Sequence, residues 1–524
     1  MTTLIAILAF IFALCLIISL HELGHFIFAK KSGILCYDYS IGMGPVLWSK
    51  KKGETTYGIR AIPIGGFVSM AGEGVGIGVI NIDQEIGLNL EDDCVKEIIL
   101  NDIEKAEVFG KVVSFDLYGE NSELYIEILV NDEYKKYSVL ENALYVESAK
   151  KTQQIAPYSR SFESKTLLQR FLTVVAGPAM NFVLAYFLFL IVCFATGVAN
   201  TKSSVVGGVE KRYSIGGEYV NGPAYEIKKG DKIISINGNP VEDWYDVGEY
   251  LDQSIKSESV NIVVSRDGVN IPLTINPIIY VGDIGIMGFS DDVTEQGVRI
   301  YIYTTKAKEA GLIDGDIITS ISFEGVNYEI KSWADIIDVS DKINGDKITV
   351  SYLRGSEAKT AVVNTLDQKT LDVIGIEKYD SIIGISPTYR FTFFGSFVNA
   401  FKSIGNCVGE VFGTLGLLFG GSNDVGVSDL SGPIGIFTLI KNSLTGGLIS
   451  YIAFVAFLSV NIGLLNILPI PALDGGRLVF LAYEAITRKK VNKNVENTIH
   501  NIMFILLMLL FVYISFNDVL RLFG

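Results

Sequence analysis

Four apolar stretches dominate this chain of 524 residues, and each is about as long as the hydrocarbon core of a bilayer. A helix needs roughly 20 consecutive apolar residues to cross that core. The charged fraction of 19% is low, because soluble domains average about 25% charged residues. The sequence therefore predicts an α-helical polytopic membrane protein with transmembrane helices at 1–30, 171–199, 446–476 and 498–517.

The composition disfavours two other classes of protein. A net charge of −15 leaves no basic surface of the kind that binds nucleic acid, so no nucleic-acid partner is expected. Five cysteines, an odd number without a C-x-x-C pair, predict neither a disulfide framework nor a thiolate zinc cluster.

Basic residues beside the spans predict how the chain lies in the membrane, because lysine and arginine are enriched on the cytosolic side. Lys30 and Lys31 follow the first span, and Arg488 and Lys489 lie between the last two. These loops are predicted to be cytosolic, and the region between the second and third spans to lie outside. A further apolar stretch, 394–421, is interrupted by charges and glycines and is predicted to be an amphipathic linker helix.

The first span contains the sequence HELGH, which places three polar side chains at membrane depth. His21 and His25 are four residues apart, so on a helix both imidazoles lie on one face and can hold one zinc ion. Glu22 then has the position of the general base in H-E-x-x-H metalloproteases. A chance pair of histidines is the alternative, but ionisable residues within a span are costly and by default functional.

A catalytic zinc usually has three protein ligands. The third span leads into NILPIPALDGGR, in which two prolines break the helix and Asp474 follows. Irregular backbone at that depth must be buried in protein or line a water-filled cavity, which makes Asp474 a reasonable third ligand. An ordinary helix-ending turn at the cytosolic surface is the alternative. His500, at the start of the last span, is predicted to be interfacial and not a ligand.

Together these motifs resemble those of the site-2 intramembrane zinc metalloproteases, in particular the bacterial RseP/RasP type with tandem PDZ domains. HELGH and the N-x-x-P-x-P-x-L-D-G-G run at 466–476 are similar to that family's two metal-site motifs and occur in the same order. The resemblance covers most of the chain except about 74–156. Further stretches that resemble the family are SIGMGP at 40–45, IRAIPIGGFVSM at 59–70, VVAGPAMNF at 174–182 and LSGPIGI at 430–436.

The resemblance implies a zinc metalloendopeptidase with one catalytic Zn²⁺. It implies that the two histidines and Asp474 bind the metal and that Glu22 is the catalytic base. It also implies substrate-binding roles for Asn461 and Asn466, which precede Asp474 in the sequence. From their chemistry alone, these amides could hold an extended substrate backbone or the developing oxyanion, or cap the broken helix.

Residues 31–73 are predicted to form a membrane-associated β-hairpin, because 56–70 alternates and contains a turn signal. In the resembled family this region is thought to pair with the unwound substrate by strand addition, which would expose the peptide carbonyls of a helix. A structural hairpin that shields the site from lipid is the alternative. The residues of this turn that are predicted to bind substrate are Ile64, Gly65, Gly66 and Phe67.

Between the second and third spans the sequence contains an internal repeat. Residues 222–238 and 306–322 resemble each other, with Gly-Asp pairs 85 residues apart, and each has a helix start and an alternating apolar strand. The repeat resembles the core of PDZ domains, so α+β PDZ domains are predicted at 203–280 and 281–388. Such domains bind an extended peptide or a C-terminus by strand addition. Alternatively they exclude bulky ectodomains by size, or the second domain only supports the first.

Residues 74–156 lie where the resembled family usually has a short connector. From Glu73 to Arg160 the chain has 18 acidic and 8 basic residues, a net charge of −10. The stretch 108–147 alternates in the manner of strands, so an acidic, β-rich cytosolic insertion is predicted, repelled by anionic lipid headgroups. It could bind a partner or be a solvated elaboration.

These observations predict an intramembrane protease in a bacterial cell membrane, with the PDZ domains outside the cytosol. The resemblance implies that its substrates are single-pass membrane proteins already cut by a site-1 protease, such as anti-sigma factors or remnant signal peptides. A non-catalytic PDZ adaptor is the alternative, but it would have no need of HELGH and Asp474. A transporter would predict inverted repeats among the spans, and the sequence has none that we detect.

Overall fold

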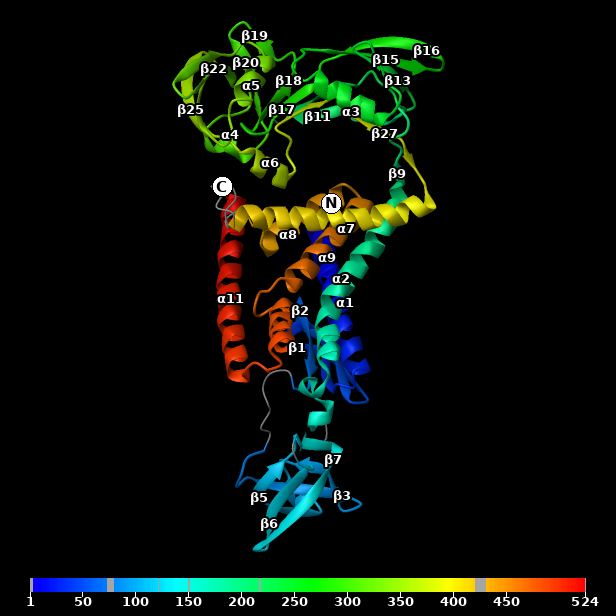
Figure 1. Ribbon diagram of the computed structural model, residues 1–524, viewed down its shortest axis with the longest axis vertical. Helices are drawn as coiled ribbons and strands as arrows, with labels where there is room; N and C mark the ends of the chain where they lie inside the picture. The colour runs from blue at the N-terminus through cyan, green and yellow to red at the C-terminus, as the bar shows by residue number, and fades with distance from the viewer. Residues whose placement is uncertain are drawn as a thin grey trace. The chain divides into compact units, whose positions relative to one another are not determined.

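The computed structural model of the protein describes residues 3–72, 80–120, 122–148, 151–215, 218–419 and 430–523. The chain divides into two compact units. The first contains 1–189 and 431–524, and the second contains 190–430. Figure 1 shows the chain and labels many of its elements.

Among the described residues, four helices are long and apolar enough to cross a membrane. They are α1 (Thr3–Lys31), α2 (Leu167–Thr196), α9 (Leu448–Ile467) and α11 (Lys493–Phe523). A shorter helix, α8 (Pro433–Thr445), packs with α1, α2 and α9 around a shared apolar core. The prediction of a helical membrane protein with inserted β-rich domains is confirmed at this level.

The third predicted span, 446–476, is not one helix. The helix α9 ends at Ile467, and Asp474 begins a separate helix, α10 (Asp474–Thr487). The two prolines between them cannot continue the α9 hydrogen-bond ladder, and Ala472 has a positive φ of 84°. The position of Asp474 is therefore set by how α10 packs and not by the axis of α9.

Glycines let the helices that surround the site approach closely. A Cβ atom on Gly24 of α1 would lie 2.2 Å from the carbonyl oxygen of Ala176 on α2. A Cβ atom on Gly463 of α9 would lie 3.0 Å from the Cβ of Asn181, also on α2. Small residues at such contacts are typical of helix packing in membranes, where backbones meet directly.

Two long antiparallel strands, β1 (Cys36–Lys52) and β2 (Thr55–Met70), occupy the predicted hairpin region. Ile41 pairs with both Ile59 and Gly66, so residues 38–41 lie between 56–59 on one side and 66–69 on the other. The chain therefore changes direction near Gly65, where φ is +83°. A second turn, at Gly53, joins the two strands.

The insertion forms a six-stranded sheet in the order β4-β3-β5-β6-β7-β8, and an additional pairing of β4 with β7 curls it back on itself. Its own apolar core includes Ile86, Leu88 and Ile126. Residues 74–79 of the predicted insertion lie outside the described residues. The strands are β3 (Glu85–Glu91), β4 (Cys94–Ile99), β5 (Val108–Asp116), β6 (Tyr125–Val130), β7 (Glu133–Ser148) and β8 (Lys151–Gln154).

The second unit contains two modules with the same order of elements after the Gly-Asp pair. The first has β13 (Lys232–Ile236), β14 (Asn239–Pro240), α3 (Trp244–Gln253), β15 (Val260–Arg266) and β16 (Val269–Ile275). The second has β22 (Ile317–Phe323), β23 (Val326–Glu329), α5 (Trp333–Ser340), β24 (Lys347–Arg354) and β25 (Glu357–Asn364).

The remaining elements of this unit connect the modules and flank them. Before β13 stand β9 (Val198–Ala199), β10 (Val206–Val209), β11 (Arg212–Ile215) and β12 (Glu218–Asn221). Between the modules stand β17 (Ile278–Val281), β18 (Ile286–Phe289), β19 (Val293–Thr294), β20 (Gly297–Arg299), β21 (Tyr301–Ile302) and α4 (Thr305–Glu309). After β25 stand α6 (Gln368–Ile374), β26 (Tyr379–Ile382), β27 (Ile385–Pro387), β28 (Tyr389–Arg390) and α7 (Phe393–Phe419). The predicted linker helix, 394–421, falls on α7, and its last two residues lie outside the described residues.

The repeat is also visible in one ion pair that occurs twice. Arg266 grips the buried carboxylate of Asp231 with Nε and Nη2, at 2.8 and 2.7 Å. Arg354 grips Asp316 in the same way, at 2.9 and 2.8 Å. Both aspartates are the second residue of the Gly-Asp pair in the repeat, so the alignment read from sequence corresponds to equivalent positions in space.

The boundary between the modules differs from the predicted one at residue 280. The strand β27, which follows the whole second module in the chain, pairs with β10 of the first. Ile383 is buried in the core of the first module, and Ile385 packs against it. The second module is therefore inserted within the first, because a sheet needs strands that are adjacent in space and not in sequence.

Candidate metal centre

Three polar side chains from two helices meet in the first unit. His21 and His25 lie one turn apart on α1, and both are 8% exposed. Their Nε2 atoms lie 3.1 Å from each other, and 3.0 and 3.3 Å from Oδ2 of Asp474. Among the described residues these three are the one group whose ligand atoms all lie within 4.8 Å of one another. The predicted ligand set therefore converges.

The backbone of α2 determines which nitrogen of His25 faces the centre. Nδ1 of His25 lies 2.8 Å from the carbonyl oxygen of Thr173. A carbonyl oxygen only accepts hydrogen bonds, so Nδ1 must carry the proton, and in the neutral ring Nε2 is left with a lone pair. A histidine that binds metal commonly has its second nitrogen held in this way.

His21 has an equivalent partner on α2, the fully buried side chain of Asn181. The amide nitrogen of Asn181 lies 3.3 Å from Nδ1 of His21, while its Oδ1 is buried without a hydrogen-bond partner. Exchanging the amide oxygen and nitrogen places Oδ1 beside His21 Nδ1, where it accepts the proton of that nitrogen. We therefore assign Asn181 as the acceptor, which leaves Nε2 of His21 free for a metal.

The carboxylate of Asp474 indicates that the centre suits a cation. Its Oδ2 is buried and has no hydrogen-bond donor, although the two imidazole nitrogens lie beside it. With both Nδ1 atoms protonated, the two Nε2 atoms and Oδ2 of Asp474 all present lone pairs to one another. Such an arrangement is stable only with a cation between the three atoms. Two imidazoles and one carboxylate form a typical ligand set of catalytic zinc, so the residues present fit that ion.

Glycines make room for this arrangement. A Cβ atom on Gly177 of α2 would lie 2.2 Å from Nε2 of His25. Behind Asp474, a Cβ atom on Gly475 would lie 1.9 Å from the carbonyl oxygen of Leu468, so only glycine lets α10 fold back over the broken segment. The motif GPAMN therefore supplies space as well as the Asn181 partner of His21, and LDGG supplies space as well as Asp474.

Glu22 and the second strand border the same cavity, which has a volume of about 570 Å³. Glu22 accepts a hydrogen bond from the backbone of Val68 on β2. A Cβ atom on Gly66 would lie 3.1 Å from Cγ of Glu22, so this strand passes directly over the carboxylate. Of the predicted hairpin residues, Gly65, Gly66 and Phe67 line the cavity.

The two predicted asparagines differ in their surroundings. Asn466 lines the cavity, and its amide nitrogen donates to the carbonyl oxygen of Ile462 at 3.0 Å. Asn461 has a buried Oδ1 without a hydrogen-bond partner among the described residues, and it is not part of the cavity lining. His500 also lines the cavity, although the sequence predicted it to be interfacial, and it is outside the group of three ligands.

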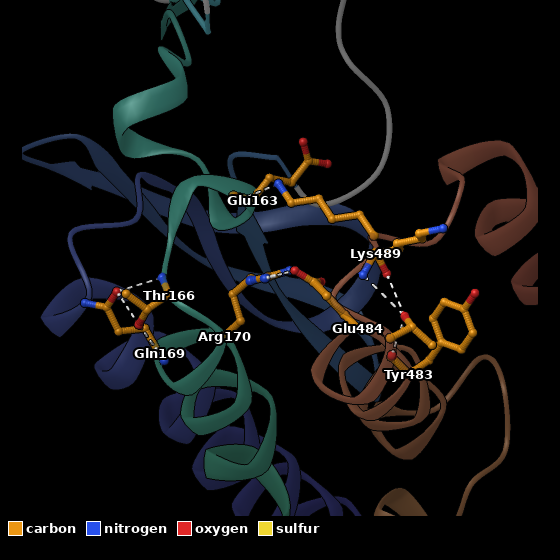
Figure 2. A network of polar contacts seen from close by, with 9 residues as sticks. Glu163, Thr166, Gln169, Arg170, Tyr483, Glu484 and Lys489 are labelled. Atoms are coloured by element: carbon orange, nitrogen blue, oxygen red, sulfur yellow. Dashed lines mark hydrogen bonds and ion pairs between the residues drawn. The ribbon is translucent and has the colours of Figure 1, made fainter.

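Sequence reasoning did not find the residues that hold the ligands in place. Asn181 lies in the GPAMN stretch and Thr173 lies before it. The resemblance of this stretch to the family assigned no role to either residue. An ion pair is a further case: Arg170 of α2 binds Glu484 of α10 through two hydrogen bonds of 2.9 and 2.7 Å. Figure 2 shows this pair, with Glu484 next to Tyr483 near the end of α10. It ties the helix that begins with Asp474 to the helix that orients His25.

These elements define a class of protein, a helical membrane protein with a buried metal centre of the H-E-x-x-H type. Residues 9–510 match the model of peptidase family M50. The chain belongs to peptidase family M50 and is a zinc metalloprotease.

Curated relatives cover the chain from end to end. It is 32% identical over 521 residues to the zinc metalloprotease RasP of Shouchella clausii (strain KSM-K16), with 99% of each chain covered. It is 29% identical over 522 residues to the regulator of sigma-W protease RasP of Bacillus subtilis (strain 168), again with 99% of each covered. A third relative is the zinc metalloprotease RasP of Geobacillus kaustophilus (strain HTA426), 29% identical over 523 residues.

Proposed function

We propose that this protease cleaves peptide bonds within, or at the edge of, the transmembrane helices of single-pass membrane proteins. The observation that carries the proposal is the position of HELGH within the long apolar helix α1, with Asp474 against it. A site of this kind is useful only to a substrate that reaches the same depth. The relative named regulator of sigma-W protease supports an anti-sigma factor as one substrate. Remnant signal peptides fit the same chemistry.

In this proposal His21, His25 and Asp474 hold the zinc ion. Zinc, when bound, polarises the scissile carbonyl and lowers the pKa of the attacking water. Glu22 takes a proton from that water and returns it to the leaving amine, since its carboxylate borders the same cavity. Asn466 lines the cavity and can donate to a substrate carbonyl, whereas Asn461 is not part of the lining and its substrate-binding role stays a prediction.

The strand that passes over Glu22 supports a way to present the substrate. Residues 66–69 pair with 38–41 along one edge, while Gly66 and Phe67 line the cavity. A substrate segment that adds to the other edge becomes extended, and its carbonyls are exposed beside the catalytic groups. We propose that Ile64 to Phe67 guide the segment into this register.

The repeated modules are proposed to be PDZ domains on the extracytoplasmic side, and the acidic insertion to lie in the cytosol. The modules then meet substrates that a site-1 protease has already trimmed. A size filter and a peptide receptor are both consistent with a substrate that loses its ectodomain before it enters the membrane.

The first test separates metal binding from catalysis. Wild type and Glu22→Gln, purified in detergent, are incubated with a tagged single-pass helix, and the zinc content of both is measured. We expect about one zinc in each, with cleavage reduced by about 10²–10⁴-fold in the variant, because only the base is lost. Equal cleavage by Glu22→Gln would contradict the assignment and favour the adaptor alternative.

A further inference from the structure

Two backbone hydrogen bonds occur in both modules of the second unit and show which of their strands correspond. In the first module Val206 donates to the carbonyl oxygen of Asp231 and accepts from Gly230, both at 2.8 Å. In the second module Ile300 makes the same two bonds with Asp316 and Gly315, both at 2.9 Å. The strand β10 therefore corresponds to β21, and their sheet partners β27 and β18 correspond to each other.

In the second module this sheet continues beyond β18. One edge of β18 pairs with β21, and the other pairs with β17 in antiparallel register, from Ile278 opposite Phe289 to Val281 opposite Ile286. Ile279 and Val281 of β17 share one buried core with Ile336 and Ile337 of α5. The chain's own strand therefore occupies the edge at which a peptide would be added.

The first module is different at the equivalent place. The strand β26, which precedes β27, turns away and pairs with β17, so in the described chain β27 pairs with β10 alone. A cleft of about 210 Å³ lies between α3 and residues 380–385. Trp244, Val247 and Leu251 of α3 form its apolar wall.

One residue of α3 has no structural reason to be glycine. The helices α3 and α5 both have a capping box and begin with a tryptophan. Gly248 of α3 and Ile337 of α5 each lie four residues after that tryptophan, so the two positions correspond. Ile337 is fully buried in the core that contains β17. A Cβ atom on Gly248 would meet no atom within 4 Å, and glycine inside a helix is less favourable than alanine. Gly248 thus keeps open the space that Ile337 fills in the second module.

The polar groups of the cleft indicate what it accepts. Ser381 is 4% exposed, lines the cleft, and its hydroxyl has no hydrogen-bond partner among the described residues. Asp252 and Asp380 line the cleft as well. Burial and then the charge of Asp380 raise the pKa of Asp252, so a further carboxylate would be repelled here and a cation would be attracted.

We propose that the cleft between α3 and residues 380–385 binds an extended peptide segment that carries a cationic side chain, and that β17 closes the corresponding cleft of the second module. The segment is internal, because a free C-terminal carboxylate would meet Asp252 and Asp380. This inference deepens the proposed recognition of trimmed substrates and rests on it. In this proposal the first module binds the peptide and the second module supports the first.

The test uses the full chain with Glu22→Gln in detergent and four fluorescein-labelled heptapeptides of alternating alanine and valine. Three are capped at both ends and have Lys, Gln or Glu at the centre, and the fourth is the Gln peptide with a free carboxyl terminus. Fluorescence anisotropy measures binding. We expect the Lys peptide to bind about tenfold more tightly than the Glu peptide, and the free carboxylate to weaken the Gln peptide.

Two variants connect binding to the cleft. Gly248→Leu fills the space and should weaken binding of the Lys peptide by about tenfold or more, while its melting temperature stays at or above that of the parent, since leucine favours the helix. Asp252→Asn should reduce the difference between the Lys and Glu peptides. Asp372→Asn, the same change on the exposed face of α6, should leave it unchanged.

Three outcomes would overturn the proposal: no binding of any capped peptide, equal binding of the Lys and Glu peptides, or unchanged binding by a folded Gly248→Leu variant. Because the protein used cannot cleave, none of these outcomes bears on zinc binding or proteolysis. Failure of the proposed proteolytic function would instead appear in the cleavage assay with wild type.

Discussion

At the scale of single residues, the candidate centre depends on groups that never touch the metal. Thr173 and Asn181 of α2 hold the outer nitrogens of His25 and His21, and so aim both Nε2 atoms at Asp474. Partners of this kind fix the tautomer and the angle of each ring, and their loss typically reduces metal affinity by about 10–100-fold. Two predictions follow from these contacts.

Replacing Asn181 with leucine should raise the dissociation constant for zinc by about 10–100-fold, because His21 loses the acceptor that orients it. Competition with a chromophoric chelator measures this affinity in detergent. Asn461→Leu is the matched control: its amide contacts no ligand, so zinc affinity should stay near the wild-type value. Equal losses in both variants would show that the effect is general loosening of the helices.

Gly177→Ala tests the space that the ring of His25 needs. The new Cβ atom would lie 2.2 Å from Nε2, so the ring must move away from Asp474 or the helices must separate. We expect zinc content after dialysis to fall well below one per chain. Gly416→Ala on α7, where a Cβ atom meets nothing within 4 Å, should retain the wild-type content.

At the scale of elements, α10 is the part of the centre with the weakest covalent constraint. An irregular segment separates it from α9, so its packing must place Asp474. The bidentate pair between Arg170 and Glu484 is mostly buried, with side chains 10% and 17% exposed. It fastens the far end of α10 to the first turn of α2, three residues before Thr173.

We therefore expect Arg170→Gln and Glu484→Gln each to weaken zinc binding, and the double variant to be no weaker than either single one. Non-additivity of this kind identifies two residues that act as a unit. Chelator competition on wild type, the two single variants and the double variant completes this double-mutant cycle. Arg266→Gln, which breaks a similar pair in the first module of the second unit, should leave zinc affinity unchanged. Additive losses would contradict a joint role in positioning α10.

At the scale of the whole molecule, stability should depend on the protonation of one buried carboxylate in the second module. Asp283 is fully buried, and burial raises its pKa to about 6. Because the folded value lies above the unfolded value of about 3.9, the folded state binds the proton more tightly. Stability is therefore greatest below the unfolded pKa and is lost as the pH rises through about 6, by ~3 kcal/mol in total.

Thermal unfolding of wild type and Asp283→Asn between pH 4 and pH 7 measures this contribution. The difference between the two proteins removes the effect of all other titrating groups. We expect wild type to lose stability relative to the variant over this range, with most of the change between pH 4 and pH 6. A constant difference would show that Asp283 does not titrate in this window.

Much of the architecture was predictable because it depends on local patterns. The four long apolar helices follow from hydrophobic length, and the position of His21 and His25 on one face of α1 follows from helical periodicity, which places residues i and i+4 together. The repeat was recognisable because both copies use the same Gly-Asp pair and strand. The insertion was recognisable as β-rich because its apolar residues alternate.

Other features were not predictable, because they depend on which distant segments become neighbours. The insertion of one module into the other and the approach of His500 to the cavity both arise from long-range packing. The sequence around Gly248 and Ile337 gives no sign that one faces an open cleft and the other a strand of the same chain. That difference depends on where β17 and β26 pair.

The chemistry of this protein could be predicted from residue type and spacing, which act over a few residues. They indicate a membrane protein with two histidines and a glutamate on one helix and an aspartate beside a helix break. The meeting of Asp474 with both histidines, their orientation by Thr173 and Asn181, and the ion pair of Arg170 with α10 became visible in the three-dimensional structure. Those contacts join residues more than a hundred positions apart, and packing between helices, not local periodicity, brings them together.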